Sequence, residues 1–146
     1  MNKLTLRYRY DSSFFDAAEV RDDFGRLSID VRTDRFSGTG AFWVQWQDVK
    51  QFGEALSAFP IATGSPIVAQ WGCNRQEGDD LILRLEIAPA NSRGELAVRF
   101  VVADDLAPHN RVMGEFLTSY AELDTFRIGI ERLMNHEADQ AVLEGH

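Results

Sequence analysis

The fold is decided by a hairpin sequence, residues 81–102, which reads LILRLEIAPANSRGELAVRFVV. Every second residue from Leu81 to Ile87 is a large aliphatic one, and the alternation returns from Leu96 to Val102. This two-residue period is typical of a strand with one buried face. The proline, asparagine and glycine between the two halves favour a turn. The segment therefore predicts two antiparallel strands joined by a short loop.

More strands are predicted on both sides of this hairpin. The two-residue period, or a short apolar run bounded by turn residues, recurs in residues 4–10, 27–33, 41–46, 67–71 and 112–118. Residues 41–46 carry large side chains on both faces, so we expect a central, covered strand there. The paired glycines of Ser37-Gly38-Thr39-Gly40 predict a break or bend before it.

Two segments have the 3.6-residue period of an amphipathic helix instead. The first is residues 49–59, where Pro60 is expected to end the helix. The second begins with the capping box Ser119-Tyr120-Ala121-Glu122. Its predicted apolar face consists of Leu123, Phe126, Ile130, Leu133 and Met134. The pattern leaves open whether this helix continues beyond His136 to Val142.

These elements predict an α+β fold over a single domain, residues 1–146. We expect a twisted, mostly antiparallel sheet of about six or seven strands, with both helices packed on one face. The length of 146 residues is typical of one domain, and no linker or repeat divides the chain.

Composition gives expectations about partners and compartment. Acidic residues outnumber basic ones by 23 to 15, a net charge of −8, so we expect no binding to nucleic acid and attraction to a protein with a basic surface. No apolar run approaches the roughly 20 residues that span a bilayer, so no membrane contact is expected. Cys73 is the single cysteine, which fits a reducing, cytoplasmic address.

The sequence contains no convincing catalytic or cofactor signature. Cys73, His109 and either Asp104 or Asp105 have the residue types of a thiol nucleophile, its base and an orienting group. A buried structural cysteine is the preferred interpretation. His136 and Asp139 supply at most half of a metal site. We therefore expect no catalytic residue, no metal and no cofactor.

Aromatic and arginine side chains supply the candidate binding residues. Trp43 and Trp46 are predicted on opposite faces of one strand, and Trp71 lies on another strand. Trp43 could be a core residue or, beside arginine on an exposed face, a binding hot spot. The candidate site residues for a ligand or partner are Trp43, Trp71, Arg84 and Arg99.

The stretch from Gly38 to Phe52, GTGAFWVQWQDVKQF, continuing to Phe59-Pro60, resembles small uncharacterised bacterial α+β proteins. The step Thr118-Ser119-Tyr120-Ala121-Glu122-Leu123 is also similar to that group. By class, the chain further resembles the immunity proteins of bacterial toxin systems. We expect a non-enzymatic protein-interaction module, immunity-like if the class-level resemblance holds, and the sequence leaves a homodimer open. The alternative is a small-molecule-binding or hydrolytic domain that uses a pocket on a bent sheet.

Overall fold

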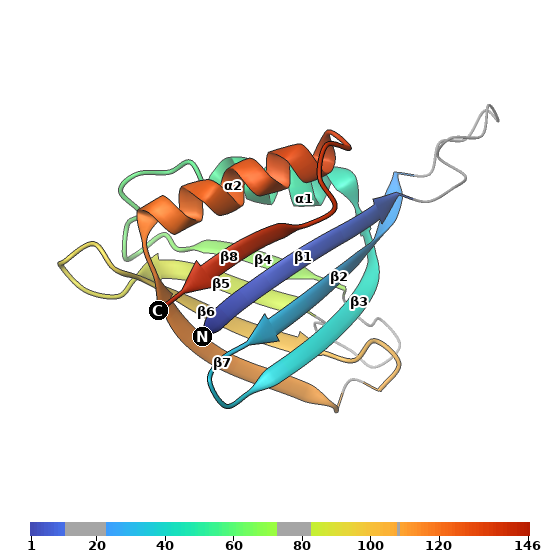
Figure 1. Ribbon diagram of the computed structural model, residues 1–146, viewed down its shortest axis with the longest axis horizontal. Coiled ribbons are helices and arrows are strands. Elements are labelled where there is room, and N and C mark those ends of the chain that lie inside the picture. Colours follow the sequence, from blue (N-terminus) through green and yellow to red (C-terminus); the bar gives the residue numbers. More distant parts are fainter. Residues whose placement is uncertain (11–22, 73–82, 108) are drawn as a thin grey trace.

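The computed structural model describes residues 1–10, 23–72, 83–107 and 109–146. This part of the chain forms eight strands and two helices (Figure 1). In chain order they are β1 (Asn2–Tyr10), β2 (Phe24–Arg32), β3 (Ser37–Gln45), α1 (Trp46–Ala55), β4 (Ile67–Trp71), β5 (Leu83–Pro89), β6 (Leu96–Ala103), β7 (Arg111–Thr118), α2 (Tyr120–Met134) and β8 (Ala141–Gly145).

The strands form two antiparallel four-stranded sheets. The first sheet has the order β3-β2-β1-β8, and the second has the order β4-β5-β6-β7. The second sheet contains the predicted hairpin, in which Leu85 lies opposite Phe100 and Ile87 opposite Val98. Strand β8 returns to the first sheet, where Leu143 pairs with Leu4 of β1. The two chain ends therefore lie side by side (Figure 1).

Both helices lie on the same side of the sheets, next to one another (Figure 1). Helix α2 is capped as predicted, because the Ser119 hydroxyl accepts a hydrogen bond from the Glu122 amide at 3.2 Å. Its predicted apolar face is buried, and Phe126 is fully inaccessible. Helix α1 ends earlier than predicted. Tight turns follow Ala55, and Phe59 lies outside the helix with 77% of its surface exposed.

The end of α2 settles a point that periodicity leaves open. The His136 amide donates to the Leu133 carbonyl, and the Glu137 amide donates to the Arg132 carbonyl at 2.8 Å. His136 has a positive φ of 60°. Together these features form a Schellman motif, which terminates a helix. The helix therefore does not continue to Val142, and residues 141–145 form strand β8 instead.

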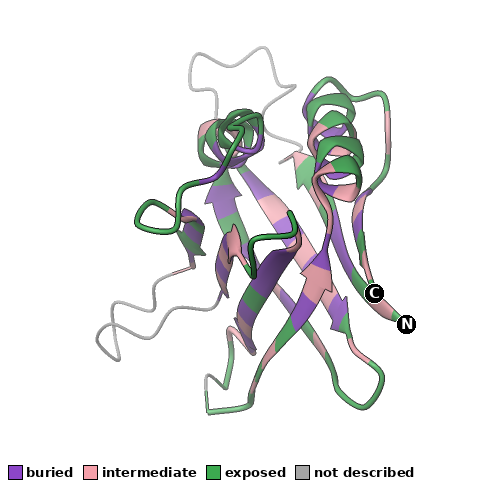
Figure 2. Cartoon of the chain, turned by 90° about the vertical axis from the view of Figure 1, so that its left-hand side faces the viewer, coloured by how far each residue is buried: buried purple, intermediate pink, exposed green. Residues whose placement is uncertain are grey.

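The core lies between the inner faces of the two sheets and is covered by the helices. Along β2 and β5, for example, buried residues alternate with more exposed ones (Figure 2). The chain does not break at Gly38 and Gly40, because both glycines lie inside β3, and β3 is an edge strand of its sheet rather than the predicted central one. A Cβ atom on Gly40 would lie 2.9 Å from Val102 and 3.0 Å from the Ala103 carbonyl oxygen. Glycine here allows β3 to pass directly over β6.

The α+β class, the antiparallel pairing and the two amphipathic helices are confirmed. The strands divide between two sheets, whereas the sequence predicted one. Alternation identifies the buried face of each strand, but it carries no information about which strands pair or what covers that face. Here each sheet is covered largely by the other. No helix in the described ranges is long and apolar enough to cross a membrane.

Candidate functional site

The structure does not bring the four predicted site residues together. Trp71 lies on the inner face of β4, where only 9% of its surface is exposed and its ring packs edge-on against Phe52 at 5.6 Å. Arg84 and Arg99 lie on the outer face of the second sheet. Trp43 lies on the outer face of the first sheet and is 53% exposed. Of the four, Trp43 alone is both aromatic and accessible.

On the outer face of the second sheet, positive and negative side chains neutralise one another. Arg99 donates to Glu115 at 2.7 Å, and its guanidinium lies 3.7 Å from Glu86, which is also 3.6 Å from Arg84. The hydrogen bond to Glu115 and the charge of that carboxylate raise the pKa of Arg99 above its ordinary value. Two arginines thus meet two carboxylates, so the cluster has no excess charge to offer an ionic partner.

The outer side of β1, β2 and β3 has a different charge balance, and we call this surface the basic face. The strand register aligns its residues in rows, such as Arg9, Arg26 and Trp43. The cations of the basic face are Lys3, Arg7, Arg9, Arg26 and Arg32, and the carboxylate on these strands is Asp30. A protein with a net charge of −8 therefore presents a locally positive sheet surface.

Asp30 neutralises one cation of the basic face and leaves others available. Its carboxylate accepts from Arg7 and from the Thr39 hydroxyl, each at 2.7 Å. Lys3, Arg9 and Arg32 form no ion pair within the described part of the chain. Lys3, Arg32 and Thr39 also line a depression of about 320 Å³ on this surface. These groups can bind anions without first breaking a salt bridge.

Aromatic side chains lie at both ends of the basic face. At one end, the Arg26 guanidinium lies 5.7 Å from the centroid of the Trp43 ring, within cation–π range. Asp105, in the loop after β6, holds this guanidinium at 3.2 Å. Phe24, one alternation further along β2, is 41% exposed. At the other end, Phe36 is 65% exposed in the turn before β3.

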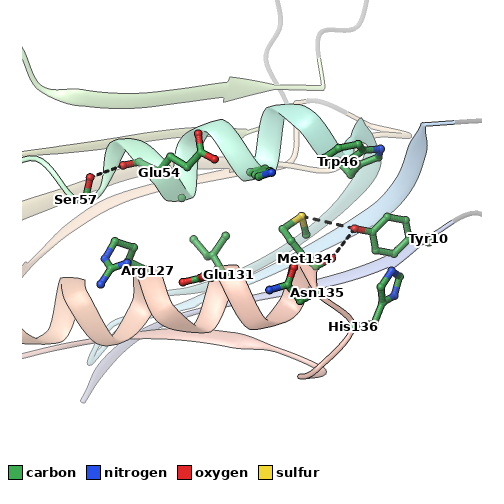
Figure 3. Close-up of a pocket in the computed structure, with 12 residues that line it drawn as sticks. Tyr10, Trp46, Glu54, Ser57, Arg127, Glu131, Met134, Asn135 and His136 are labelled. Atoms are coloured by element: carbon green, nitrogen blue, oxygen red, sulfur yellow. Dashed lines mark hydrogen bonds between the residues drawn. The ribbon is translucent and has the colours of Figure 1, made fainter.

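A separate groove of about 540 Å³ lies between α1 and α2 (Figure 3). At one end, Trp46 and Tyr10 line it from opposite sides, and the Tyr10 hydroxyl donates to the Met134 carbonyl at 3.0 Å. Burial raises the pKa of this hydroxyl above its ordinary value. Glu54 of α1 and Glu131 of α2 also line the groove (Figure 3).

The residues considered for catalysis do not form a described site. Cys73 lies outside the described residues. Asp104 accepts from the Leu106 amide at 2.9 Å, and Asp105 binds Arg26. His109 is exposed. In the described ranges, no three His, Cys, Asp or Glu residues are grouped to hold a metal ion.

Two solved structures share the two-sheet α+β arrangement of this chain. WHY1 from Arabidopsis thaliana is 16% identical, with a TM-score of 0.55, and the match covers 92% of this chain and 84% of that chain. The plant transcriptional regulator PBF-2 is 14% identical, with a TM-score of 0.52 and coverage of 92% and 76%. At these identities the likeness shows the fold alone. No protein-family model and no curated protein matches the sequence.

These neighbours contradict two predictions from the sequence, the protein-interaction module and the absence of a nucleic-acid partner. One neighbour is a transcriptional regulator, a class that acts on nucleic acid. A net charge sums the whole surface, whereas a phosphate backbone meets only one face, so the net charge does not exclude a nucleic-acid partner. The resemblance to bacterial families stays a prediction.

Sequence reasoning did not single out the cations of the basic face or its aromatic residues other than Trp43; Arg26 and Phe24, which lie beside Trp43, are examples. A signal for Arg26 was present, because it alternates with Leu27 and Ile29 and so belongs to the outer face of its strand. Phe24 carried no such signal, because the neighbouring Asp22, Asp23 and Gly25 are residues that favour a turn. Their position beside Trp43 depends on strand pairing, which no local pattern reveals.

Proposed function

We propose that this protein binds single-stranded nucleic acid on the basic face. The observation that carries the proposal is Trp43, a half-exposed indole beside Arg26 at one end of a cationic sheet surface. Exposed aromatic rings on a sheet provide stacking platforms for unpaired bases, and cations beside them bind the phosphates. A duplex keeps its bases stacked inside and cannot use such a platform.

The dimensions of the basic face suit several nucleotides. Lys3 and Arg9 are six residues apart on β1, which corresponds to about 20 Å at about 3.3 Å per residue. Trp43 and Phe24 stand at one end of this span, and Phe36 stands near the other. We assign base stacking to these aromatic residues and phosphate binding to Lys3, Arg9 and Arg32. The likeness to PBF-2, a transcriptional regulator, supports a nucleic-acid partner.

Fluorescence anisotropy tests the proposal directly. A labelled single strand of about 15 nucleotides is titrated with the protein, and a duplex of the same length is the comparison. We expect saturable binding of the single strand and weaker binding of the duplex at the same salt concentration. Equal or tighter binding of the duplex, or no binding of the single strand at low salt, would contradict the proposal.

A further inference from the structure

The groove between α1 and α2 has the features of a separate ligand site. Its volume of about 540 Å³ lies within the range of small-molecule pockets. The groove differs from the basic face in the charges that line it. Its two walls also belong to different elements from those of the basic face. The first sheet contributes Tyr10 at the mouth, and the two helices, with residues that directly follow them, contribute the remaining lining. Figure 3 shows aromatic rings at one end of the groove and carboxylates further along it.

The aromatic end suits a planar ring. Tyr10 lies 4.4 Å from His136, with an angle of 33° between the rings, and Trp46 lines the groove from α1. The Lys50 ammonium lies 5.9 Å from the Trp46 ring centroid, so a hydrogen-bond donor is also present at this end. Aromatic walls with one nearby donor are typical of pockets that stack a base and bind its edge.

The carboxylate end suits hydroxyl groups and disfavours phosphate. Glu54 and Glu131 form no ion pair with the described residues, so their oxygens can accept hydrogen bonds from a ligand. Arg127 also lines the groove, but its guanidinium is already bound by Asp124 at 2.8 and 3.0 Å. A phosphate would meet two negative charges here, whereas vicinal hydroxyls would donate to them, as ribose hydroxyls do to acidic residues.

The spacing along the groove leaves room for a base and its sugar between the aromatic end and the carboxylate end. Trp46 and Glu54 are eight residues apart on α1, which corresponds to about 12 Å along the helix axis. The groove mouth also lies where the basic face ends, because Trp46 directly follows β3 and its amide donates to the Asp23 carbonyl at 3.1 Å. A strand that leaves the basic face at Phe24 and Trp43 would reach the groove next.

We infer that the groove binds a ribonucleoside unit with a free 2′,3′-diol, its base between Tyr10 and Trp46 and its diol at Glu54 and Glu131. A free nucleoside and the 3′-terminal residue of an RNA strand both have this chemistry. The second source rests on the proposed function; the first does not.

Calorimetric titration with free adenosine tests the groove independently of the basic face. We expect adenosine to bind about tenfold more tightly than 2′-deoxyadenosine or adenosine 5′-monophosphate, since a hydrogen bond to a charged group is lost or a repulsion is added. The double variant Glu54→Gln and Glu131→Gln should remove this preference. Glu115→Gln, on the outer face of the second sheet, is the matched control and should retain it.

Equal binding of adenosine and 2′-deoxyadenosine would overturn the inference, as would absence of adenosine binding or a preference that survives the double variant. A second titration with RNA strands ending in a 3′-hydroxyl or a 3′-phosphate separates the sources. Preference for the 3′-hydroxyl, lost in the double variant, identifies the strand end as the occupant. Equal binding of the two strands, with adenosine still bound, supports the free nucleoside. If the RNA strands bind but adenosine does not, the inference about the groove is refuted and the proposed function of the basic face is not.

Discussion

Arg26 lies over Trp43, with its guanidinium 5.7 Å from the indole ring centroid, and Asp105 holds the same guanidinium at 3.2 Å. The two sheets therefore meet in this arrangement, because Trp43 and Arg26 belong to the first sheet and Asp105 follows a strand of the second. The ion pair limits the positions that Arg26 can take and leaves Trp43 half exposed. Because the cation beside the stacking ring is already held in place, less conformational entropy is lost when a ligand binds.

Replacing Trp43 by alanine should weaken binding of single-stranded nucleic acid by about 1–3 kcal/mol, the usual effect of losing one base-stacking ring. Stability should change little because the side chain is half exposed. Fluorescence anisotropy measures the affinity, and urea unfolding measures the stability. Met113→Ala, an exposed residue of the second sheet, is the control and should bind normally. Unchanged affinity of the Trp43 variant would remove this residue from the interface.

Binding should weaken with salt in proportion to the number of phosphates neutralised. If Lys3, Arg9 and Arg32 each bind one phosphate, the slope of log K against log salt concentration should be about −2, from about −0.7 for each contact on a single strand. Arg9→Gln and Arg32→Gln should each make the slope less negative by about 0.7. Arg99→Gln should leave the slope unchanged, because Arg99 is paired with Glu115 on the other sheet. A slope near zero would contradict phosphate binding.

Phe126→Ala should destabilise the protein by about 3–5 kcal/mol, as expected for a large aromatic side chain that is fully buried. The ring projects from the buried side of α2, and its centroid lies 6.4 Å from that of the Phe52 ring of α1. Its loss therefore leaves a cavity beneath both helices. Denaturant unfolding measures the effect, with the 44%-exposed Ile128→Ala on the same helix as control. A loss below about 0.5 kcal/mol would be inconsistent with this packing.

Gly40→Ala should destabilise the protein by about 1–3 kcal/mol, the range for overpacking a close contact. The new methyl group would meet the Ala103 carbonyl oxygen at 3.0 Å and would press β3 away from β6. Gly64→Ala is the matched control, because a Cβ atom there meets nothing within 4 Å. Thermal unfolding of the two variants compares them directly. Equal melting temperatures would show that the sheets can separate at no cost.

Ser119→Ala should destabilise the protein by about 1 kcal/mol, because the Glu122 amide at the start of α2 loses its acceptor. Urea unfolding checks the loss, with Ser92→Ala in the exposed loop between β5 and β6 as control. Stability equal to that of the unmodified protein would mean that water satisfies the amide equally well.

Local patterns predicted the elements of this fold well and their assembly poorly. The alternation of residues 83–102 and the serine cap at Ser119 depend on neighbours in sequence, and both are observed. Strand β8 escaped prediction because its five residues, AVLEG, are too few to distinguish a strand from the end of a helix. The division into two sheets depends on contacts between distant segments, such as Gly40 with Val102.

The four candidate site residues lie apart in the structure for the same reason. Trp43 alternates with Phe42 and Val44, which puts it on the opposite face of the strand, but the pattern leaves open whether that face is covered. Trp71 has an equal apolar character, but its face of β4 is the inner one. Arg84 and Arg99 lie on the outer face of a different sheet from Trp43, and pairing partners rather than spacing decide this.

The pairing of β8 with β1 has a consequence for the order of folding. Asn2 lies opposite Gly145, so the first sheet joins residues separated by almost the whole chain. Contacts of such long sequence separation form late, because a large loop must close before they contribute. On the ribosome, β1 can pair with β2 early, but its other edge must wait for residues 141–145. The second sheet, whose strands are consecutive, can be complete before the first sheet obtains its fourth strand.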